Sequence, residues 1–149
     1  MPLPELLSNR PLACAISAWA IAQTLKMLLF LVLEKQFDWR RLIDTGGLPS
    51  AHSAFASGLA TGVAWADGLS SSTFAVAAVF ASVVMYDAVS IRREAGKHAD
   101  VLNELLLLTF IRDSVKERAM LKELLGHTPV EVMAGAALGI LVGSALSSL

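Results

Sequence analysis

Four segments of this chain are apolar over about the length that a helix needs to cross a lipid bilayer, roughly 20 residues. A helix also satisfies its own backbone hydrogen bonds, which the hydrocarbon layer demands. Hydrophobic residues make up 55% of the 149 positions and charged residues 17%, a balance typical of membrane proteins. We therefore expect an all-α integral membrane helical bundle that forms one domain over residues 1–149. Its four expected spans cover residues 11–33, 49–66, 72–91 and 128–146.

The segment 92–127 is mixed rather than apolar. From Leu102 onward, leucines recur at helical spacing beside Asp100, Asn103 and Glu104, which is the pattern of an amphipathic helix. We expect one or two such helices to lie at the membrane surface. A small soluble cap is the alternative that the same pattern allows.

The basic residues indicate the orientation of the spans. Nearly all Lys and Arg fall in segments 34–48 and 92–127, whereas the turn near Asp67 has none. By the positive-inside rule, both basic segments lie on the cytoplasmic side and both termini on the other. We therefore expect a multi-pass protein of the cell inner membrane. The formal net charge of −1 gives no bulk attraction to nucleic acid.

Two of the expected spans carry a stripe of small residues at every fourth position. Small residues at this spacing let membrane helices approach closely, because van der Waals contact holds helices together in lipid. The stripes are Ser50, Ala54, Gly58, Gly62 and Ala66 in the second span, and Gly135, Gly139 and Gly143 after Glu131 in the last. We expect them to face each other or a shared neighbour; unrelated packing or a dimer contact is the alternative.

A histidine lies at the start of each of these two helices, on the same expected side of the membrane. His52 follows Gly46 and Gly47, which uncover backbone amides, and Pro49, which suits the first helical turn. A helix N-terminus binds anions, and a histidine can transfer a proton. If the stripes meet, His52 and His127 flank one anion, with rings roughly 5–8 Å apart when both reach the same group.

The residues after His127 form a predicted capping box. Thr128 is the N-cap, Pro129 is the first helical residue, and the Glu131 carboxylate returns to the N-cap. This accounts structurally for these three residues and leaves His127 to be explained. We interpret Glu131, or a nearby carbonyl, as orienting the imidazole so that one ring nitrogen can attack. The third histidine, His98, has no distinctive setting and is interpreted as a surface residue.

Cationic side chains surround the same face. Arginine can bind a phosphate through two parallel hydrogen bonds and lysine as a point charge, so we expect a phosphate clamp. Its members would be Lys26, Arg92, Arg93 and Lys97. Topology signalling and contact with anionic lipids are the alternative for the basic group, and snorkelling to the surface is the alternative for Lys26. No Cys/His cluster suggests zinc, and neither a metal nor another cofactor is expected.

Residues 46–53, Gly-Gly-Leu-Pro-Ser-Ala-His-Ser, resemble the P-S-x-H motif of the type 2 phosphatidic acid phosphatase superfamily, which includes vanadium haloperoxidases. His127 with Glu131 resembles the last motif of that superfamily, a histidine followed four positions on by a carboxylate. From about Trp19 to Gly139, the chain is most similar to the divergent bacterial branch. That branch carries stretches similar to Gln23 with Lys26, Val84–Ala88, Arg92–Arg93, Gly96–Lys97 and Leu124–Pro129.

The resemblance implies a phosphoric monoester hydrolase that removes phosphate from a lipid without a metal. By this resemblance, His127 would be the nucleophile that forms a phosphohistidine, and His52 would protonate the leaving alcohol. Ser50 and the amides of Gly46 and Gly47 would hold phosphate oxygens. The substrate would be an inner-leaflet lipid such as phosphatidylglycerol phosphate or phosphatidic acid, with a prenyl phosphate as the second choice.

Departures from the superfamily pattern leave other functions open. The first motif, Lys-x6-Arg-Pro, is not intact after Lys26 or Lys35, the Ser-Arg pair expected before His127 is absent, and Glu131 replaces the usual aspartate. The superfamily also tends to have six spans and an outward-facing site. A non-catalytic membrane protein that binds or transports an anionic lipid is the alternative, and a vanadate-dependent peroxidase is the third. Homo-oligomerisation is left open.

Overall fold

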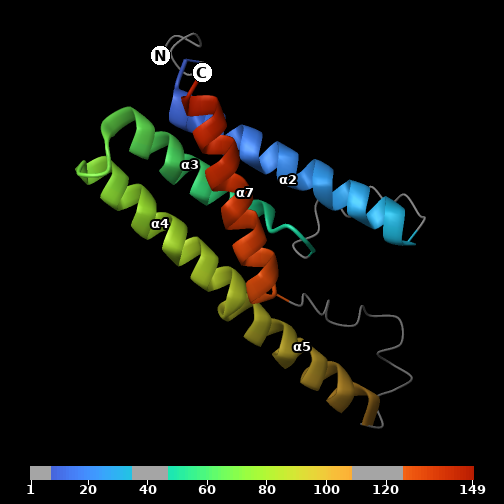
Figure 1. Ribbon diagram of the computed structural model, residues 1–149. Helices are drawn as coiled ribbons and strands as arrows, with labels where there is room; N and C mark the ends of the chain where they lie inside the picture. Colours follow the sequence, from blue (N-terminus) through green and yellow to red (C-terminus); the bar gives the residue numbers. More distant parts are fainter. Residues whose placement is uncertain (1–7, 35–46, 109–125) are drawn as a thin grey trace.

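The computed structural model describes residues 8–34, 47–108 and 126–149, and in these ranges every regular element is a helix (Figure 1). This confirms the expected all-α fold class. The helices are α2 (Arg10–Glu34), α3 (Ala51–Asp67), α4 (Ser72–Val89), α5 (Ile91–Leu108) and α7 (Pro129–Ser147).

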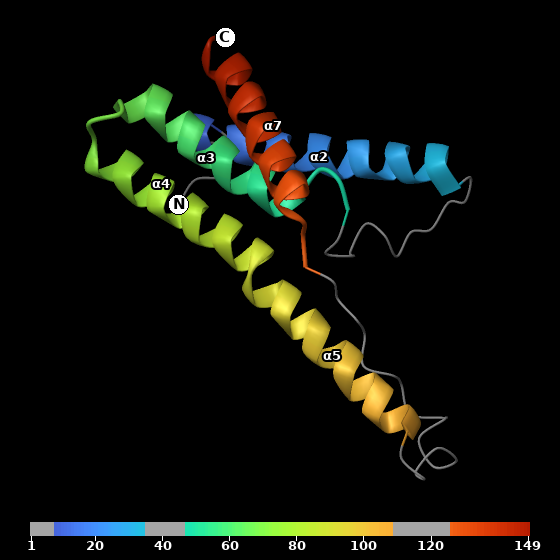
Figure 2. The same cartoon turned by 60° about the horizontal axis from the view of Figure 1, so that its bottom comes forward.

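Helix α3 is the centre of the bundle, since it packs against α2, α4 and α7 (Figures 1 and 2). Its start lies near the middle of α2, and its Gly62 lies against Pro11 at the start of α2, so these two helices are antiparallel. Its Gly58 and Thr61 lie against Gly143 near the end of α7, so α3 and α7 run parallel. The chain then turns at Gly68 and returns as α4.

Small side chains fill the interior of the bundle. The buried apolar residues are mostly alanines, among them Ala18, Ala22 and Ala54. Large apolar residues point outward instead; Val32, Val76 and many others are well exposed. A soluble protein rarely exposes so much contiguous apolar surface. Hydrocarbon is therefore the surrounding medium, in which close backbone approach holds the helices together.

Three of the four expected spans are long and apolar enough to cross a membrane: Arg10–Leu33 of α2, α4 and α7. Helix α3 has 17 residues, or about 25 Å at the usual helical rise. That is shorter than the hydrocarbon layer of about 30 Å. The crossing of α3 therefore stays a prediction.

The observed start of α3 differs by two residues from the expected start of the second span at Pro49. Helix α3 begins at Ala51, and Ser50 is its N-cap, with an extended backbone and a side chain that accepts a hydrogen bond from the Ser53 amide. Serine is a preferred N-cap residue, so Pro49 precedes the helix instead of opening it. The end of α4 at Val89 likewise falls short of the expected residue 91.

Helix α5 follows α4 after Ser90 alone and extends away from the other helices, roughly in line with α4 (Figure 2). Its side chains Lys97 and His98 are exposed, whereas Asn103 is buried. A helix is thus present where the first amphipathic helix was expected, and the exposure of His98 is confirmed. The location of α5 at the membrane surface stays a prediction. The second expected amphipathic segment falls in residues 109–125, outside the described part of the chain.

Candidate functional site

The imidazole rings of His52 and His127 meet although they lie far apart in the chain. Their centroids are 6.3 Å apart and their planes are inclined at 80°, an edge-to-face arrangement. This separation falls within the range predicted from the sequence. His127 is only 2% exposed, whereas His52 is exposed at the bundle surface. The pair therefore joins one interior imidazole to one accessible imidazole.

Backbone hydrogen bonds hold the start of α7 against two other helices. The Ser50 amide donates to the carbonyl oxygen of Glu131 at 3.0 Å, which connects the start of α3 to that of α7. The His127 amide donates to the carbonyl oxygen of Ala88 at 3.1 Å, near the end of α4. Three helix ends thus converge on the histidine pair, and main-chain contacts fix their relative positions.

The predicted capping box at the start of α7 is present. The Thr128 hydroxyl accepts from the Glu131 amide at 3.3 Å, and the Glu131 carboxylate accepts from the Thr128 amide at 3.0 Å. Pro129 occupies the first helical turn, as expected. The Glu131 carboxylate therefore caps α7, whereas its main-chain carbonyl joins α7 to α3, and both groups lie close to His127 in the chain.

The glycine stripe of α7 lies on α3, as the sequence predicted. A Cβ atom on Gly135 would collide with the Ser50 carbonyl oxygen, and one on Gly139 would collide with the Ser57 hydroxyl. The Ser57 hydroxyl also donates to the carbonyl oxygen of Ala136 at 3.1 Å, across the same interface. Glycine is required here because the two backbones approach too closely for any side chain.

The glycines of α3 face a different neighbour. A Cβ atom on Gly58 would lie 2.9 Å from the Cβ of Ala18, and one on Gly62 would lie 2.7 Å from the Cα of Pro11. Both partners belong to α2. The stripe of α3 therefore serves two contacts. The Cβ positions of its glycines face α2, whereas Ser50, Ala54 and the backbone of Gly58 lie against α7. The sequence left two arrangements open, in which the stripes face each other or a shared neighbour. Helix α3 takes part in both.

Lys26 lies beside the loop that leads into α3. A Cβ atom on Gly47 would lie 3.1 Å from the Cε of Lys26, so the lysine stem covers this glycine. Gly47 has a φ angle of +99°, a conformation that favours glycine. The contact with Lys26 and the positive φ angle therefore both favour glycine at position 47. Lys26 therefore packs on the loop before α3, and its part in a phosphate clamp stays a prediction.

A sequence model described as the Divergent PAP2 family matches residues 7–142 of this chain. The chain belongs to the Divergent PAP2 family. It is also 43% identical over 148 residues to the uncharacterized membrane protein YuiD of Bacillus subtilis strain 168, which covers 93% of this chain and 94% of that relative. No solved structure matches this sequence significantly. Together with the three apolar helices, these findings establish a membrane protein of the divergent PAP2 branch.

Other expected site residues of this Divergent PAP2 protein do not all join the histidine pair. Ser50 is fully buried, and its hydroxyl oxygen caps α3 by accepting from the Ser53 amide at 3.4 Å and the Ser53 hydroxyl at 3.0 Å. Lys97 pairs with Glu94 at 2.6 Å on the exposed side of α5. The side chains of Arg92 and Arg93 and all of Gly46 lie outside the described part, so their roles stay predictions. Within the described ranges, no group of three His, Cys, Asp or Glu side chains could hold a metal ion.

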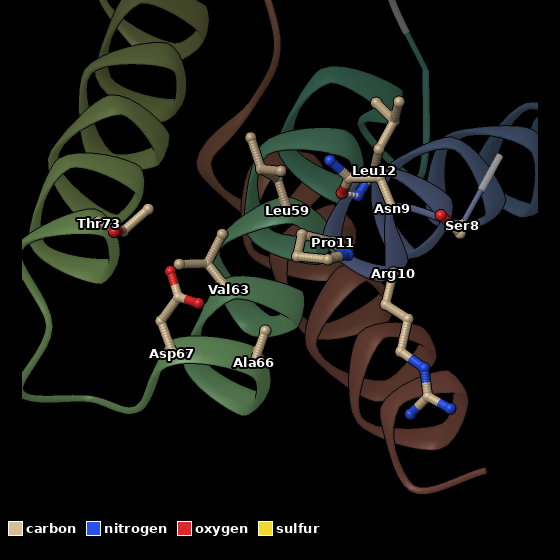
Figure 3. Close-up of a pocket in the computed structure, with 10 residues that line it drawn as sticks. All are labelled: Ser8, Asn9, Arg10, Pro11, Leu12, Leu59, Val63, Ala66, Asp67 and Thr73. Atoms are coloured by element: carbon tan, nitrogen blue, oxygen red, sulfur yellow. Dashed lines mark hydrogen bonds between the residues drawn. The ribbon is translucent and has the colours of Figure 1, made fainter. Parts of the chain in front are cut away.

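Among the described residues of this Divergent PAP2 member, hollows flank α3 that the sequence did not indicate. The first, of about 390 Å³, includes His52 and is otherwise apolar; its lining is Ile16, Trp19, His52, Phe55, Ala56, Phe80 and Val84. We call it the His52 groove. Its residues follow helical spacing within each helix, but the sequence could not indicate which three helices would share it. The second hollow lies at the opposite end of α3, where Asp67 and Val63 approach the first turn of α2 (Figure 3).

Proposed function

We propose that this protein is a membrane lipid phosphate phosphatase that works through a phosphohistidine at the cytoplasmic membrane face. The observation that carries the proposal is the edge-to-face pair of His52 and His127 at 6.3 Å. Membership of the Divergent PAP2 family supports the reaction class. Phosphatidylglycerol phosphate and phosphatidic acid are the preferred substrates, and a prenyl phosphate is the second choice.

In the proposed first step, a ring nitrogen of His127 attacks the phosphorus atom. A nitrogen–phosphorus bond forms as the bond from phosphorus to the lipid oxygen breaks, and His52 donates its proton to that oxygen. In the second step, His52 takes a proton from water as that water attacks the phosphohistidine. Inorganic phosphate leaves, and both histidines return to their starting states. General acid–base catalysis of this kind contributes about 10²–10⁴-fold.

The proposed electrostatic support comes from two helix N-termini and one lysine. The starts of α3 and α7 are joined by the bond between Ser50 and Glu131 and lie beside the histidine pair. Each N-terminus carries a partial positive charge, which favours a phosphate. Lys26 lies at Gly47, next to the same loop. We assign Lys26 the role of the cation that the incomplete first motif lacks, with Gly46, Arg92 and Arg93 as further phosphate contacts.

Glu131 is assigned a positioning role. Its carboxylate caps α7 through Thr128, and its carbonyl oxygen receives the Ser50 amide. Because both contacts lie within four residues of His127, they fix where the imidazole can stand. The carboxylate need not touch the phosphate for this role.

The test uses the purified full chain in liposomes that contain phosphatidic acid or phosphatidylglycerol phosphate, with a chelator present. Phosphate release should be clear for the wild type and for His98→Ala, whose ring is exposed on α5. His127→Ala should release none above background. Equal release by the wild type and by His127→Ala would exclude His127 as the nucleophile.

The alternative is a non-catalytic protein that binds or transports an anionic lipid. The missing Lys-x6-Arg-Pro motif favours this alternative, because a complete phosphate clamp would bring more arginine to the site. It predicts binding of phosphatidic acid without turnover, with affinity that survives His52→Ala and His127→Ala. Turnover by the wild type would exclude it.

A further inference from the structure

We propose that the His52 groove binds the part of the lipid substrate's hydrocarbon chain that lies nearest the phosphate-bearing headgroup. This inference rests on the proposed function and names the part of the substrate that the groove recognises. The groove is bounded by one turn from each of three helices, with Ile16 and Trp19 on α2 and Phe80 and Val84 on α4. Helix α3 supplies His52, Phe55 and Ala56.

The residues that line the groove form rows that lead away from the histidine pair along the bundle. On α3 the lining proceeds from His52 to Ala56, away from the histidine pair. Helix α2 and helix α4 both run antiparallel to α3, so their lining residues proceed the same way from Trp19 to Ile16 and from Val84 to Phe80. One helical turn is about 5.4 Å long, so the groove has room for only a few carbon atoms of the lipid. Its polar end coincides with the candidate site.

The chemistry of the lining selects an amphiphile. His52 is the polar side chain of the groove, and the six others are aliphatic or aromatic. Ile16, Trp19 and Phe80 are also exposed at the outer surface of the bundle, where the membrane surrounds apolar helices. Hydrocarbon is the medium that fills an apolar groove at that position. A lipid with its phosphate at His52 and its hydrocarbon chain in the groove matches both the polar and the apolar part of the lining. A water-soluble phosphate contacts the polar part alone.

Positioning, more than affinity, is the expected contribution of the groove. A lipid chain that enters it exchanges one apolar environment for another, so little transfer energy is gained. The chain instead fixes the direction in which the ester oxygen approaches His52, and orientation of this kind raises the rate of the chemical step. Filling the groove should therefore lower kcat for a long-chain lipid more than it raises KM.

The first experiment compares two substitutions at neighbouring positions of α4. Val84 lines the groove, whereas Val83 is exposed and lies outside the lining. Val84→Phe should lower phosphate release from dioleoyl phosphatidic acid by about tenfold or more, as misfit in an apolar pocket does. Release from glycerol 3-phosphate should stay unchanged, and Val83→Phe should change neither. Equal effects of both variants, or an equal loss on both substrates, would overturn the groove proposal.

The second experiment measures binding without turnover, so that the groove and the proposed reaction can fail separately. His127→Ala is reconstituted with a phosphatidic acid that carries a photoreactive group near the start of one chain. Labelling should fall on residues 16–19, 52–56 and 80–84, and unlabelled phosphatidic acid should compete better than phosphatidylcholine. Equal competition by the two lipids would mean that bulk lipid fills the groove and would overturn the proposal. Groove labelling without turnover in the wild type would reject the phosphatase reaction alone.

Discussion

The backbone amide of Ser50 donates a 3.0 Å hydrogen bond to the carbonyl oxygen of Glu131. This single bond joins the first turns of two parallel helices that come from opposite halves of the chain. It lies close to both histidines, since His52 follows Ser50 by two residues and His127 precedes Glu131 by four. The 6.3 Å spacing of the rings is therefore a property of the joint between α3 and α7.

The joint predicts different effects for two substitutions of Glu131. A glutamine can accept the same hydrogen bond from the Thr128 amide, so Glu131→Gln should keep both stability and phosphate release close to those of the wild type. Glu131→Ala removes the acceptor and should cost about 0.5–2 kcal/mol of stability, with slower phosphate release. Thermal unfolding in detergent and the liposome assay measure the two effects. A large rate loss in Glu131→Gln with normal stability would show that the carboxylate charge itself takes part in the reaction.

The two histidines should differ in what their removal does to a covalent intermediate. With labelled lipid phosphate and rapid quenching at high pH, the wild type should carry phosphate on His127. His52→Ala should slow phosphate release by about 10²–10⁴-fold, because the lipid oxygen then leaves without its proton donor. Peptide mass spectrometry locates the phosphate. Phosphate found on His52 would reverse the assigned roles.

Gly139 should not tolerate a side chain. A Cβ atom there would collide with the Ser57 hydroxyl and the Ala54 carbonyl oxygen, both on α3. Gly139→Leu should therefore separate α7 from α3 and destabilise the bundle by about 1–3 kcal/mol or more. Ala137→Leu is the matched control, because Ala137 is exposed on the same helix. Unfolding in mixed micelles, followed by tryptophan fluorescence, should show a lower midpoint for Gly139→Leu alone; equal midpoints would contradict the close contact.

Lys26 should act on the phosphate group. A hydrogen bond to a charged group contributes about 1.5–3 kcal/mol, so Lys26→Met should lower kcat/KM by roughly 10- to 100-fold. Thr24→Val is the control on the same helix, since the Thr24 side chain is exposed and bonds within α2 to the Ala20 carbonyl oxygen at 2.8 Å. Steady-state measurements of kcat/KM on phosphatidic acid compare the two variants. If Lys26→Met behaves like Thr24→Val, the clamp lies elsewhere.

The orientation of the helices can be tested with single cysteines in a Cys14→Ala background, since Cys14 is the only native cysteine. Leu69→Cys reports on the exposed turn between α3 and α4, and His98→Cys reports on α5. A membrane-impermeant thiol reagent should label His98→Cys from the cytoplasmic side and Leu69→Cys from the other. If α3 crosses the membrane, the reagent should label Leu48→Cys from the same side as His98→Cys. Labelling of Leu48→Cys and Leu69→Cys from the same side would mean that α3 does not cross.

Local features of this protein were predictable because they depend on residues a few positions apart. The capping box of Thr128 and Glu131 and the apolar lengths of α2, α4 and α7 follow from short-range patterns. The start of α3 was the exception, since Pro49 was expected in its first turn. The structure assigns the cap to Ser50.

Contacts between helices were only partly predictable. The stripes of small residues indicated that α3 and α7 would pack closely, because only small residues allow backbones to touch. They did not indicate that Gly58 and Gly62 would face α2 while Gly139 would face Ser57. In lipid, both faces of a helix can be apolar, so hydrophobicity alone does not reveal which face is buried.

Residue patterns alone indicated an all-α membrane protein of the divergent PAP2 branch with a histidine at the start of two helices. The packing of the helices was needed to show that His52 and His127 meet, that Lys26 covers Gly47, and that three helices enclose the His52 groove. The physical reason is distance along the chain. Caps and apolar lengths are local, whereas the crossing of helices depends on how all their surfaces fit together.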